Sequence, residues 1–379
     1  MGAVTPTATR RRRDELVEAL GRADDASDVF AETSNRLRRL VPFDAAVWVT
    51  ADPATGLPTA PTRIDALHDV TAEQCSDNWR REYLVSDVNL FRDVARSPTP
   101  AAGLRTVAGD PARSPRYRKL LQPLGFDDEL RAVFRAGDSA WGLVSLMRGD
   151  GRAPFTSQET EMVASLAAPI GEALRVRARP TEALGGLVRH DQPGLMLFDA
   201  NTELVSTNEQ AKAWLAELPE DRGLPTDLGI EVPMWVLATV FRAAAGCPGH
   251  GDGTARARVR TRRGPWLVCH ASCVRDAGGS PQNTVAVIEA AKAAEIAPII
   301  VQAYDLSDRE QQITRLIARG ASTTEIASEL FLSSHTVRDH VKAIFGKVEV
   351  ASRGELVAKL FAEYYEPVHL QGPVVHTSD

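Results

Sequence analysis

Closely spaced helix-start signals in residues 306–364 constrain the fold more than any other feature of the chain. Ser307, Ser322 and Ser352 are each followed three residues later by a glutamate. In such a capping box the serine hydroxyl accepts a hydrogen bond from an N–H of the first turn, and the glutamate accepts one from the N–H of the serine. Ser333 can cap a fourth helix. Starts this close together leave no room for strands, so the segment is predicted to be a bundle of four short helices.

The third helix of this bundle is predicted to have an apolar face opposite a polar one. Its apolar residues recur at i, i+4, i+7 and i+11, which is the pattern of a buried helical stripe. They are Val337, Val341, Ile344 and Val348. The residues expected on the free face are His335, Arg338, Asp339 and Lys342. Two short helices joined by a three-residue turn, the second with cations on its free face, are typical of a helix-turn-helix.

The sequence of this bundle resembles the LuxR/FixJ-type helix-turn-helix. The resemblance runs without gaps through residues 306–353. Its motifs are LSDRE (306–310), GAS (320–322), EIA (325–327), LS (332–333), TVR (336–338), HV (340–341), KV (347–348) and SR (352–353). It implies a homodimer that binds double-stranded operator DNA, with the third helix in the major groove.

The resemblance also implies roles for single positions. Arg338 and Lys342 fall on groove-facing positions, and a bidentate arginine–guanine pair is worth about 1–3 kcal/mol of discrimination. His335 lies on the same face. Asp339 departs from the family pattern, because a carboxylate repels phosphate but can accept a hydrogen bond from cytosine N4. Five further residues fall near positions that contact DNA phosphates in this family: Thr323, Thr324, Thr336, Lys347 and Arg353.

The charge of this segment leaves an alternative open. Residues 305–364 contain eight Lys/Arg and nine Asp/Glu, a formal charge of −1, and the whole chain carries −6. A DNA-binding domain usually presents a basic patch, so any contact with DNA must be local and reinforced by dimerisation. The alternative is an interaction protein that does not bind DNA and uses the bundle only for assembly.

Residues 14–178 are expected to form an α+β domain. The predicted order is a helix over 14–40, a strand over 45–50, a turn at 52–56, a helix over 71–84, a long Pro- and Arg-rich connection over 86–122, strands near 129–136 and 140–148, and a helix up to Arg177. Thr156 and Glu159 form the capping box of that last helix. With the motifs LGF (124–126), DELR (128–131), WG (141–142) and FT (155–156), this order resembles a GAF domain.

Residues 182–291 are expected to form a second α+β domain, which resembles a PAS domain in the order of its elements. A strand over 194–199, a turn, a strand ending at Thr207 and a helix capped by Asn208 open it. Three strands over 255–262, 266–274 and 283–289 close it. Residues 292–304 are an apolar linker, interrupted by Pro298, that is a candidate for dimerisation, and the helix-turn-helix domain occupies 305–366.

Two further patterns have competing interpretations. Arg256, Arg258, Arg260 and Arg262 alternate along one predicted strand and therefore share a face, which favours a solvated surface over a site for an anionic ligand, a partner or DNA. Cys247, His250, Cys269 and Cys273 could suggest zinc. However, Cys269 and Cys273 lie about 13 Å apart on a straight strand, so buried cysteines are the favoured interpretation. Cys75 is expected in the core rather than as a redox sensor.

Composition sets the remaining limits. The chain has 379 residues, 44% hydrophobic and 25% charged, which suits several globular domains. Four cysteines favour a reducing cytoplasm without a disulfide framework, and neither a signal peptide nor a membrane helix is expected. No catalytic motif is found, so an enzyme is not expected, and no cofactor can be named. The prediction is a cytoplasmic, multidomain α+β transcriptional regulator, in which a small-molecule ligand or a partner protein at the sensor domains controls the helix-turn-helix.

Overall fold

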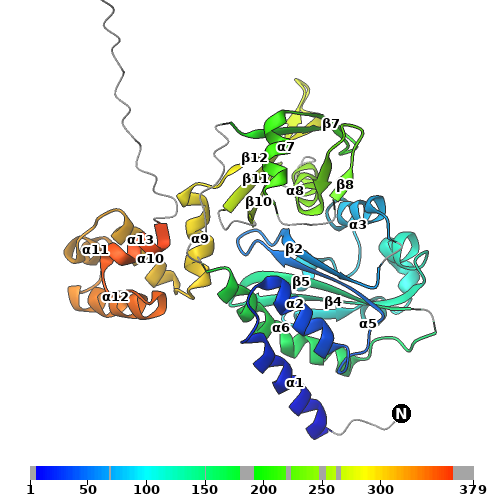
Figure 1. The fold of residues 1–379 in the computed structure, drawn as a ribbon, viewed down its shortest axis with the longest axis horizontal. Helices are drawn as coiled ribbons and strands as arrows, with labels where there is room; N and C mark the ends of the chain where they lie inside the picture. Colours follow the sequence, from blue (N-terminus) through cyan, green and yellow to red (C-terminus); the bar gives the residue numbers. More distant parts are fainter. Residues whose placement is uncertain are drawn as a thin grey trace, which may run out of the picture. The chain divides into compact units, whose positions relative to one another are not determined.

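The computed structural model describes residues 6–67, 70–149, 151–179, 192–218, 223–246, 253–261 and 266–361 (Figure 1). The chain divides into two compact units, Met1–Ala291 and Lys292–Asp379. The first unit contains two antiparallel α+β regions, and the second is entirely helical. This confirms the predicted fold class. None of the described helices is both long and apolar enough to cross a lipid bilayer.

A five-stranded antiparallel sheet forms the centre of the first α+β region, in the order β2-β1-β5-β4-β3. Its strands are β1 (Ala45–Ala51), β2 (Pro58–Asp65), β3 (Ala101–Gly103), β4 (Phe126–Ala136) and β5 (Ser139–Gly149). The predicted hairpin between β4 and β5 is confirmed, and it turns at Gly137, where φ is +58°. Successive side chains of a strand point to opposite faces. Trp48 therefore lies on one face of β1, whereas Val47 and Val49 lie on the other.

Two helices, α2 (Ala26–Leu37) and α6 (Ser157–Arg177), cover the Trp48 face of this sheet, and α1 (Pro6–Leu20) packs against both of them (Figure 1). The single helix expected over 14–40 is wrong. Asp25 begins a new helix because its side chain accepts a hydrogen bond from the Asp28 N–H, and the first helix ends before Gly21. The Thr156 capping box of α6 is confirmed. Gly171 lets α6 approach β4 closely, since a Cβ there would lie 2.5 Å from the Arg135 backbone.

The opposite face of the sheet is covered by short elements. They are α3 (Ala72–Leu84), α4 (Phe91–Arg96), α5 (Leu104–Ala108), a 3-10 turn η1 (Pro111–Arg113) and a π-helical turn η2 (Tyr117–Leu121). The helix predicted over 71–84 is confirmed and starts with a capping box between Thr71 and Gln74. The connection expected over 86–122 therefore contains several short helices and strand β3, which the sequence pattern did not resolve.

The second α+β region has a sheet of its own, in the order β10-β11-β12-β6-β7. Its strands are β6 (Gly194–Phe198), β7 (Leu204–Thr207), β10 (Thr254–Arg260), β11 (Trp266–Arg275) and β12 (Pro281–Ala290), and they confirm the predicted strands. Asn208 caps α7 (Glu209–Ala216) as expected. Between these elements lie the small strands β8 (Gly223–Pro225) and β9 (Glu231–Pro233) and the helix α8 (Met234–Ala245), none of which was predicted.

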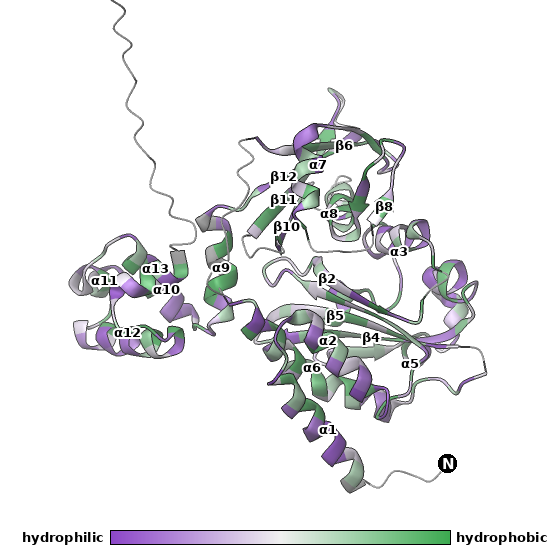
Figure 2. Ribbon diagram, in the orientation of Figure 1, coloured by the Kyte–Doolittle hydropathy of each residue, from purple (hydrophilic) through white to green (hydrophobic). Residues whose placement is uncertain are grey.

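One hydrophobic core extends through both α+β regions. It contains Val49, Trp79 and Leu143 from the first region together with Met196 and Trp235 from the second. The two regions therefore pack on each other through α3 and α8. Figure 2 shows α8 as largely hydrophobic, in agreement with its buried position.

A buried ion pair also joins the two regions, and it corrects the expected solvated arginine face. The Asp52 carboxylate accepts a hydrogen bond from the Arg258 backbone N–H at 3.0 Å and lies 3.4 Å from Arg258 Nε. Both side chains are almost completely buried. Arg256 remains exposed and Arg260 is half-buried, whereas Arg262 lies outside the described residues.

The cysteine predictions are only partly correct. Cys269 is fully buried, and burial raises the pKa of its thiol to about 12. Cys273, however, is disulfide-bonded, so it is not a simple packed cysteine. Cys75 is half-buried on α3. Cys247 and His250 lie outside the described residues.

The helical unit begins with α9 (Ala293–Ala303), which occupies the predicted linker and is mostly hydrophobic in Figure 2. Four helices follow: α10 (Asp308–Ala318), α11 (Thr323–Glu329), α12 (Ser334–Val348) and α13 (Arg353–Phe361). They confirm the predicted four-helix bundle. Helix α12 packs against α10 and α11, and α13 packs against α9 and α10.

Candidate nucleic-acid interface and a buried ionic cluster

Side-chain caps position the helices of the bundle. The Ser307 and Ser322 hydroxyls accept from the N–H groups of Glu310 and Glu325, and each glutamate accepts in return from the N–H of its serine at 2.7 Å. These hydrogen bonds lower the pKa of Glu325. The third predicted capping box is only half formed. Ser352 accepts from the Glu355 N–H, but the Glu355 carboxylate accepts from the N–H of Ala351 instead.

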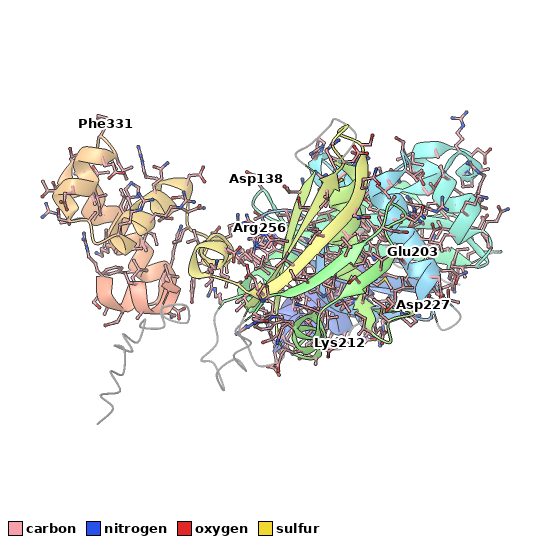
Figure 3. The ribbon with its side chains drawn as sticks, turned by 90° about the horizontal axis from the view of Figure 1, so that it is seen from above. Asp138, Glu203, Lys212, Asp227, Arg256 and Phe331 are labelled. Atoms are coloured by element: carbon pink, nitrogen blue, oxygen red, sulfur yellow. The ribbon has the colours of Figure 1, made fainter. Side chains whose placement is uncertain are left out.

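The turn between α11 and α12 sets the direction of the second helix. Phe331 adopts a left-handed conformation with φ of +55°, and the Leu332 N–H donates to the Ala327 carbonyl at 2.9 Å. Ser333 then caps α12 by accepting from the Thr336 N–H at 3.0 Å. Phe331, labelled in Figure 3, is 95% exposed, so this turn presents an aromatic ring to solvent that the sequence analysis missed.

Helix α12 buries one face and exposes the other, largely as predicted. Val337, Ile344 and Val348 are fully buried. Val341 is only half-buried, contrary to expectation, because it lies at the border of the apolar stripe. The opposite face exposes His335, Arg338, Asp339 and Lys342.

The four exposed side chains of α12 differ in their partners. His335 Nδ1 lies 2.9 Å from an Asp339 carboxylate oxygen, one helical turn away, and both side chains are mostly exposed. The carboxylate that departs from the family pattern therefore already has a local partner. Arg338 and Lys342, by contrast, make no ion pair within the described part of the chain. They lie one turn apart and are the accessible cations of this face.

Lys347 and Arg353 donate hydrogen bonds to oxygens in other parts of the bundle. The Lys347 ammonium donates to the Asp305 carbonyl at 2.8 Å and to the Glu310 carboxylate at 2.7 Å. Burial raises the pKa of Glu310, but the hydrogen bonds from Lys347 and Ser307 outweigh it, so the pKa lies below its usual value. This contact fastens α12 to α10.

The guanidinium of Arg353 joins the start of α13 to the start of α11. It donates to the Ala321 carbonyl and to the Thr323 hydroxyl, both at 2.8 Å. Thr324, the residue after Thr323, is exposed. The Thr336 hydroxyl is 2.9 Å from that of Ser333. Of the residues predicted near phosphate, Thr324 and Thr336 are therefore not engaged by another helix, whereas Thr323, Lys347 and Arg353 are.

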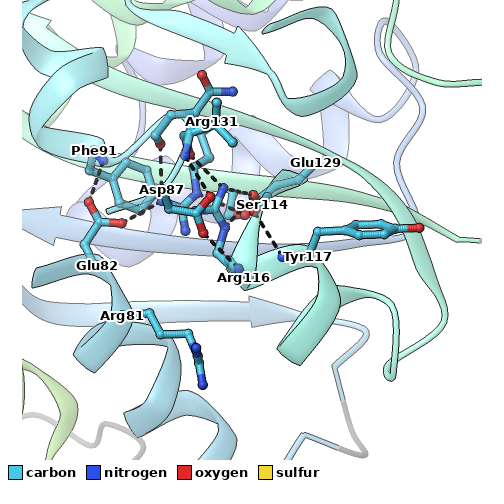
Figure 4. A network of polar contacts seen from close by, with 12 residues as sticks. Arg81, Glu82, Asp87, Phe91, Ser114, Arg116, Tyr117, Glu129 and Arg131 are labelled. Atoms are coloured by element: carbon cyan, nitrogen blue, oxygen red, sulfur yellow. Dashed lines mark hydrogen bonds and ion pairs between the residues drawn. The ribbon is translucent and has the colours of Figure 1, made fainter. Parts of the chain in front are cut away.

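The first unit contains a buried ionic cluster that the sequence analysis did not find. It consists of Glu82, Asp87, Arg116, Glu129 and Arg131, each at most 3% exposed at the side chain. Figure 4 shows its hydrogen bonds and ion pairs as dashed lines. Glu82 on α3 accepts from Arg131 at 2.6 Å and from the Phe91 N–H at 2.6 Å. The cluster thus connects β4 with the helices of the Val47 face.

Glu129 lies at the centre of this cluster. One carboxylate oxygen accepts from Arg116 at 2.9 and 2.7 Å, and the other accepts from Arg131 at 3.0 Å and from the Ser145 hydroxyl. Burial raises the pKa of Glu129, but the charges of Arg116 and Arg131 lower it more, to about 2. A glutamate and an arginine at i and i+2 share one face of β4. That pattern was the available sequence signal for the cluster.

A tight turn followed by a helix that carries two accessible cations on its exposed face places the second unit in the helix-turn-helix class. Residues 305–360 match the family model for bacterial regulatory proteins, luxR family. The chain is 40% identical over 55 residues to the spore germination protein GerE of Bacillus subtilis, a match covering 14% of this chain and 74% of GerE. The chain therefore belongs to the luxR family of bacterial regulatory proteins.

Other matches are less extensive. The transcriptional regulatory protein DesR of Bacillus subtilis is 41% identical over 58 residues, which cover 15% of this chain and 29% of DesR. The chain thus spans less than a third of DesR. Among solved structures, the GAF domain/HD domain protein from Geobacter sulfurreducens aligns with 41% of this chain and 93% of its own, at 18% identity and a TM-score of 0.29.

Proposed function

We propose that this protein is a sequence-specific, DNA-binding transcriptional regulator whose α+β regions control the C-terminal helix-turn-helix. The observation that carries the proposal is the exposed face of α12, on which Arg338 and Lys342 lie one turn apart without an intramolecular ion-pair partner in the described chain. Other cations of the bundle, Lys347 and Arg353, already bind its own oxygens. Arg338 and Lys342 are thus the side chains available for base edges.

The neighbouring residues support a contact of this kind. The Asp339 carboxylate lies 2.9 Å from His335 Nδ1, so it has a partner one helical turn away on the same helix. Thr324 and Thr336, at the first turns of α11 and α12, are the best placed of the predicted residues to bind phosphate, because Thr323, Lys347 and Arg353 also serve contacts between helices. Since the segment carries a formal charge of only −1, we propose that two copies of the chain bind a two-fold symmetric operator together.

Binding-site selection from random duplexes tests the proposal. The full chain is compared with Arg338→Ala and with the control Arg315→Ala, which removes an exposed arginine from α10 instead. We expect Arg338→Ala to weaken binding to the best site by about 1–3 kcal/mol and to relax preference at one base position. Arg315→Ala should select the wild-type site.

Two outcomes would contradict the proposal. Identical selected sites for the wild type and Arg338→Ala would remove Arg338 as a base reader. If none of the three proteins enriched a sequence and binding was undetectable at low salt, the bundle would instead be an assembly module, the alternative interpretation of its near-neutral charge.

A further inference from the structure

A cleft opens between the turn that joins β1 to β2 in the first α+β region and the edge strand β10 of the second. It has a volume of about 580 Å³, within the roughly 300–1,000 Å³ of small-molecule sites. Thr55 and Leu57 line it from the turn, and Arg242 lines it from α8. Strands β10 and β11 contribute polar side chains to its lining: Thr254, Arg256, His270 and Ser272.

The pairing of β10 with β11 brings these four polar side chains to one face of the sheet. Arg256 lies opposite His270, and Thr254 lies opposite Ser272. Directly opposite residues of an antiparallel pair point to the same face, and so do residues two apart along a strand. Arg256, which is labelled in Figure 3, therefore stands among side chains that can all donate a hydrogen bond.

The backbone of β10 adds another donor at the edge of the sheet. The Arg258 N–H donates to the Asp52 carboxylate of the β1–β2 turn at 3.0 Å, so it points away from β11. The direction of the N–H groups reverses at each residue of a strand, and β10 pairs with β11 without a shift in register. The N–H of Arg256, two residues earlier, therefore points to the same edge, next to its own guanidinium.

The cleft carries positive charge that the protein does not neutralise. Arg242 and Arg256 are exposed, and neither makes an ion pair or a side-chain hydrogen bond within the described part of the chain. No carboxylate is among the described residues that line the cleft. Asp52 belongs to the same turn as Thr55, but its carboxylate is already paired with Arg258. Guanidiniums in such a setting are suited to bind carboxylate and phosphate groups.

We propose that this cleft binds a small anionic molecule through a carboxylate or phosphate group, which Arg256 and Arg242 hold. Arg256 donates from its guanidinium and from its backbone N–H, and the Ser272 hydroxyl lies on the same face. Because Thr55 and Leu57 belong to the first α+β region and Arg256 to the second, the bound molecule contacts both regions. The inference goes beyond the proposed DNA binding and stands independently of it.

Benzoate and benzamide test the inference on the full chain, because they have nearly the same shape and only benzoate is charged. Phenyl phosphate is the second anionic probe. Binding is measured by titration calorimetry at about 0.15 M ionic strength, where attraction between distant surface charges is largely screened. We expect at least one anionic probe to bind saturably with a Kd below about 1 mM. Tighter binding of benzoate would identify a carboxylate ligand, and tighter binding of phenyl phosphate a phosphate ligand.

Benzamide should bind about ten-fold more weakly than the better anionic probe, or not at all, because it forms no charge-assisted hydrogen bond between ions. Arginine variants then locate the site. Arg256→Gln and Arg242→Gln each remove a guanidinium without an internal ion pair, so the fold should persist, which thermal unfolding checks. We expect each to weaken the anionic probe about ten-fold. Arg256→Lys should recover part of the loss, since it restores the charge but not the planar fork of donors.

Arg275→Gln is the control, because it removes an exposed arginine of β11 that does not line the cleft. It should bind the anionic probe as the wild type does. The inference would be overturned by any of four results: no saturable binding of either anionic probe, equal binding of benzamide, unchanged binding in both Arg256→Gln and Arg242→Gln, or an equal loss in Arg275→Gln. None of these measurements uses DNA, so a failure here leaves the proposed function intact, and a failure to bind DNA leaves the cleft intact.

Discussion

Glu129→Gln is expected to destabilise the first compact unit by about 3 kcal/mol at neutral pH. Glu129 is 2% exposed and accepts hydrogen bonds from both Arg116 and Arg131. Its pKa of about 2, against an ordinary 4.5, corresponds to about 3 kcal/mol in favour of the folded, charged form. Removal of one partner from a buried ion pair costs about 3–5 kcal/mol. The pKa shift of Glu129 and the usual cost of breaking a buried ion pair therefore predict a similar loss of stability.

The pH dependence has a definite sign. Because folding lowers the pKa of Glu129, its contribution is fully present above the unfolded-state value near 4.5 and is lost as the pH falls towards 2. The stability difference between the wild type and Glu129→Gln should thus be constant from pH 6 to pH 8. It should narrow by about 1 kcal/mol at pH 4.

Urea unfolding followed by tryptophan fluorescence measures this difference. All six tryptophans lie at or before Trp266, so the signal reports only the first unit. Glu32→Gln is the control, because Glu32 makes an exposed ion pair with Arg36 at 2.8 Å, which is worth at most about 1 kcal/mol. Equal losses in the two variants, or a loss below about 1 kcal/mol in Glu129→Gln, would refute the reasoning.

Three further predictions concern the surface of α12, the packing of α6 and the assembly of the chain. Asp339→Asn should tighten binding to operator and scrambled DNA alike in titrations at fixed salt, whereas weaker binding at one base pair only would identify Asp339 as a reader of cytosine. Gly171→Ala should destabilise the first unit by about 1–3 kcal/mol in urea, because the new Cβ meets the Arg135 backbone; unchanged stability would show that α6 can shift. A fragment of residues 292–379 should bind the operator much more weakly than the full chain, with the full chain dimeric in sedimentation; equal affinity together with a monomeric full chain would exclude the dimer mechanism.

Local signals explain why the helical unit could be predicted well. Capping boxes act within one helical turn, so Ser307 and Ser322 fixed their helix starts with no knowledge of the rest of the chain. The roles of Lys347 and Arg353 were less accessible. Their oxygen partners include Glu310, 37 residues from Lys347, and Thr323, 30 residues from Arg353, and no local pattern indicates such contacts.

Helix α8 shows a different limit of predicting helices from the sequence. It runs MWVLATVFRAAA, and nine of its twelve residues are buried. A helix that is buried nearly all round lacks the alternation of polar and apolar faces from which helices are usually inferred. Helix α8 therefore gave no periodic signal, and Trp235 could only be assigned to a core, as were the other five tryptophans.

The arginines of β10 show which part of a prediction from strand periodicity requires the tertiary structure. Period 2 correctly places Arg256 and Arg258 on one face of the strand, yet Arg256 is exposed and Arg258 is buried. The difference comes from Asp52, which lies 206 residues earlier and meets the Arg258 backbone. A charge on a sheet face is solvated only if no other part of the chain covers it. The same reasoning applies to Glu129 and Arg131, whose partners Glu82 and Arg116 come from the short helices over 72–121. In both cases the sequence pattern determined the face of the strand, and the tertiary packing determined whether that face served as surface or as a buried polar contact.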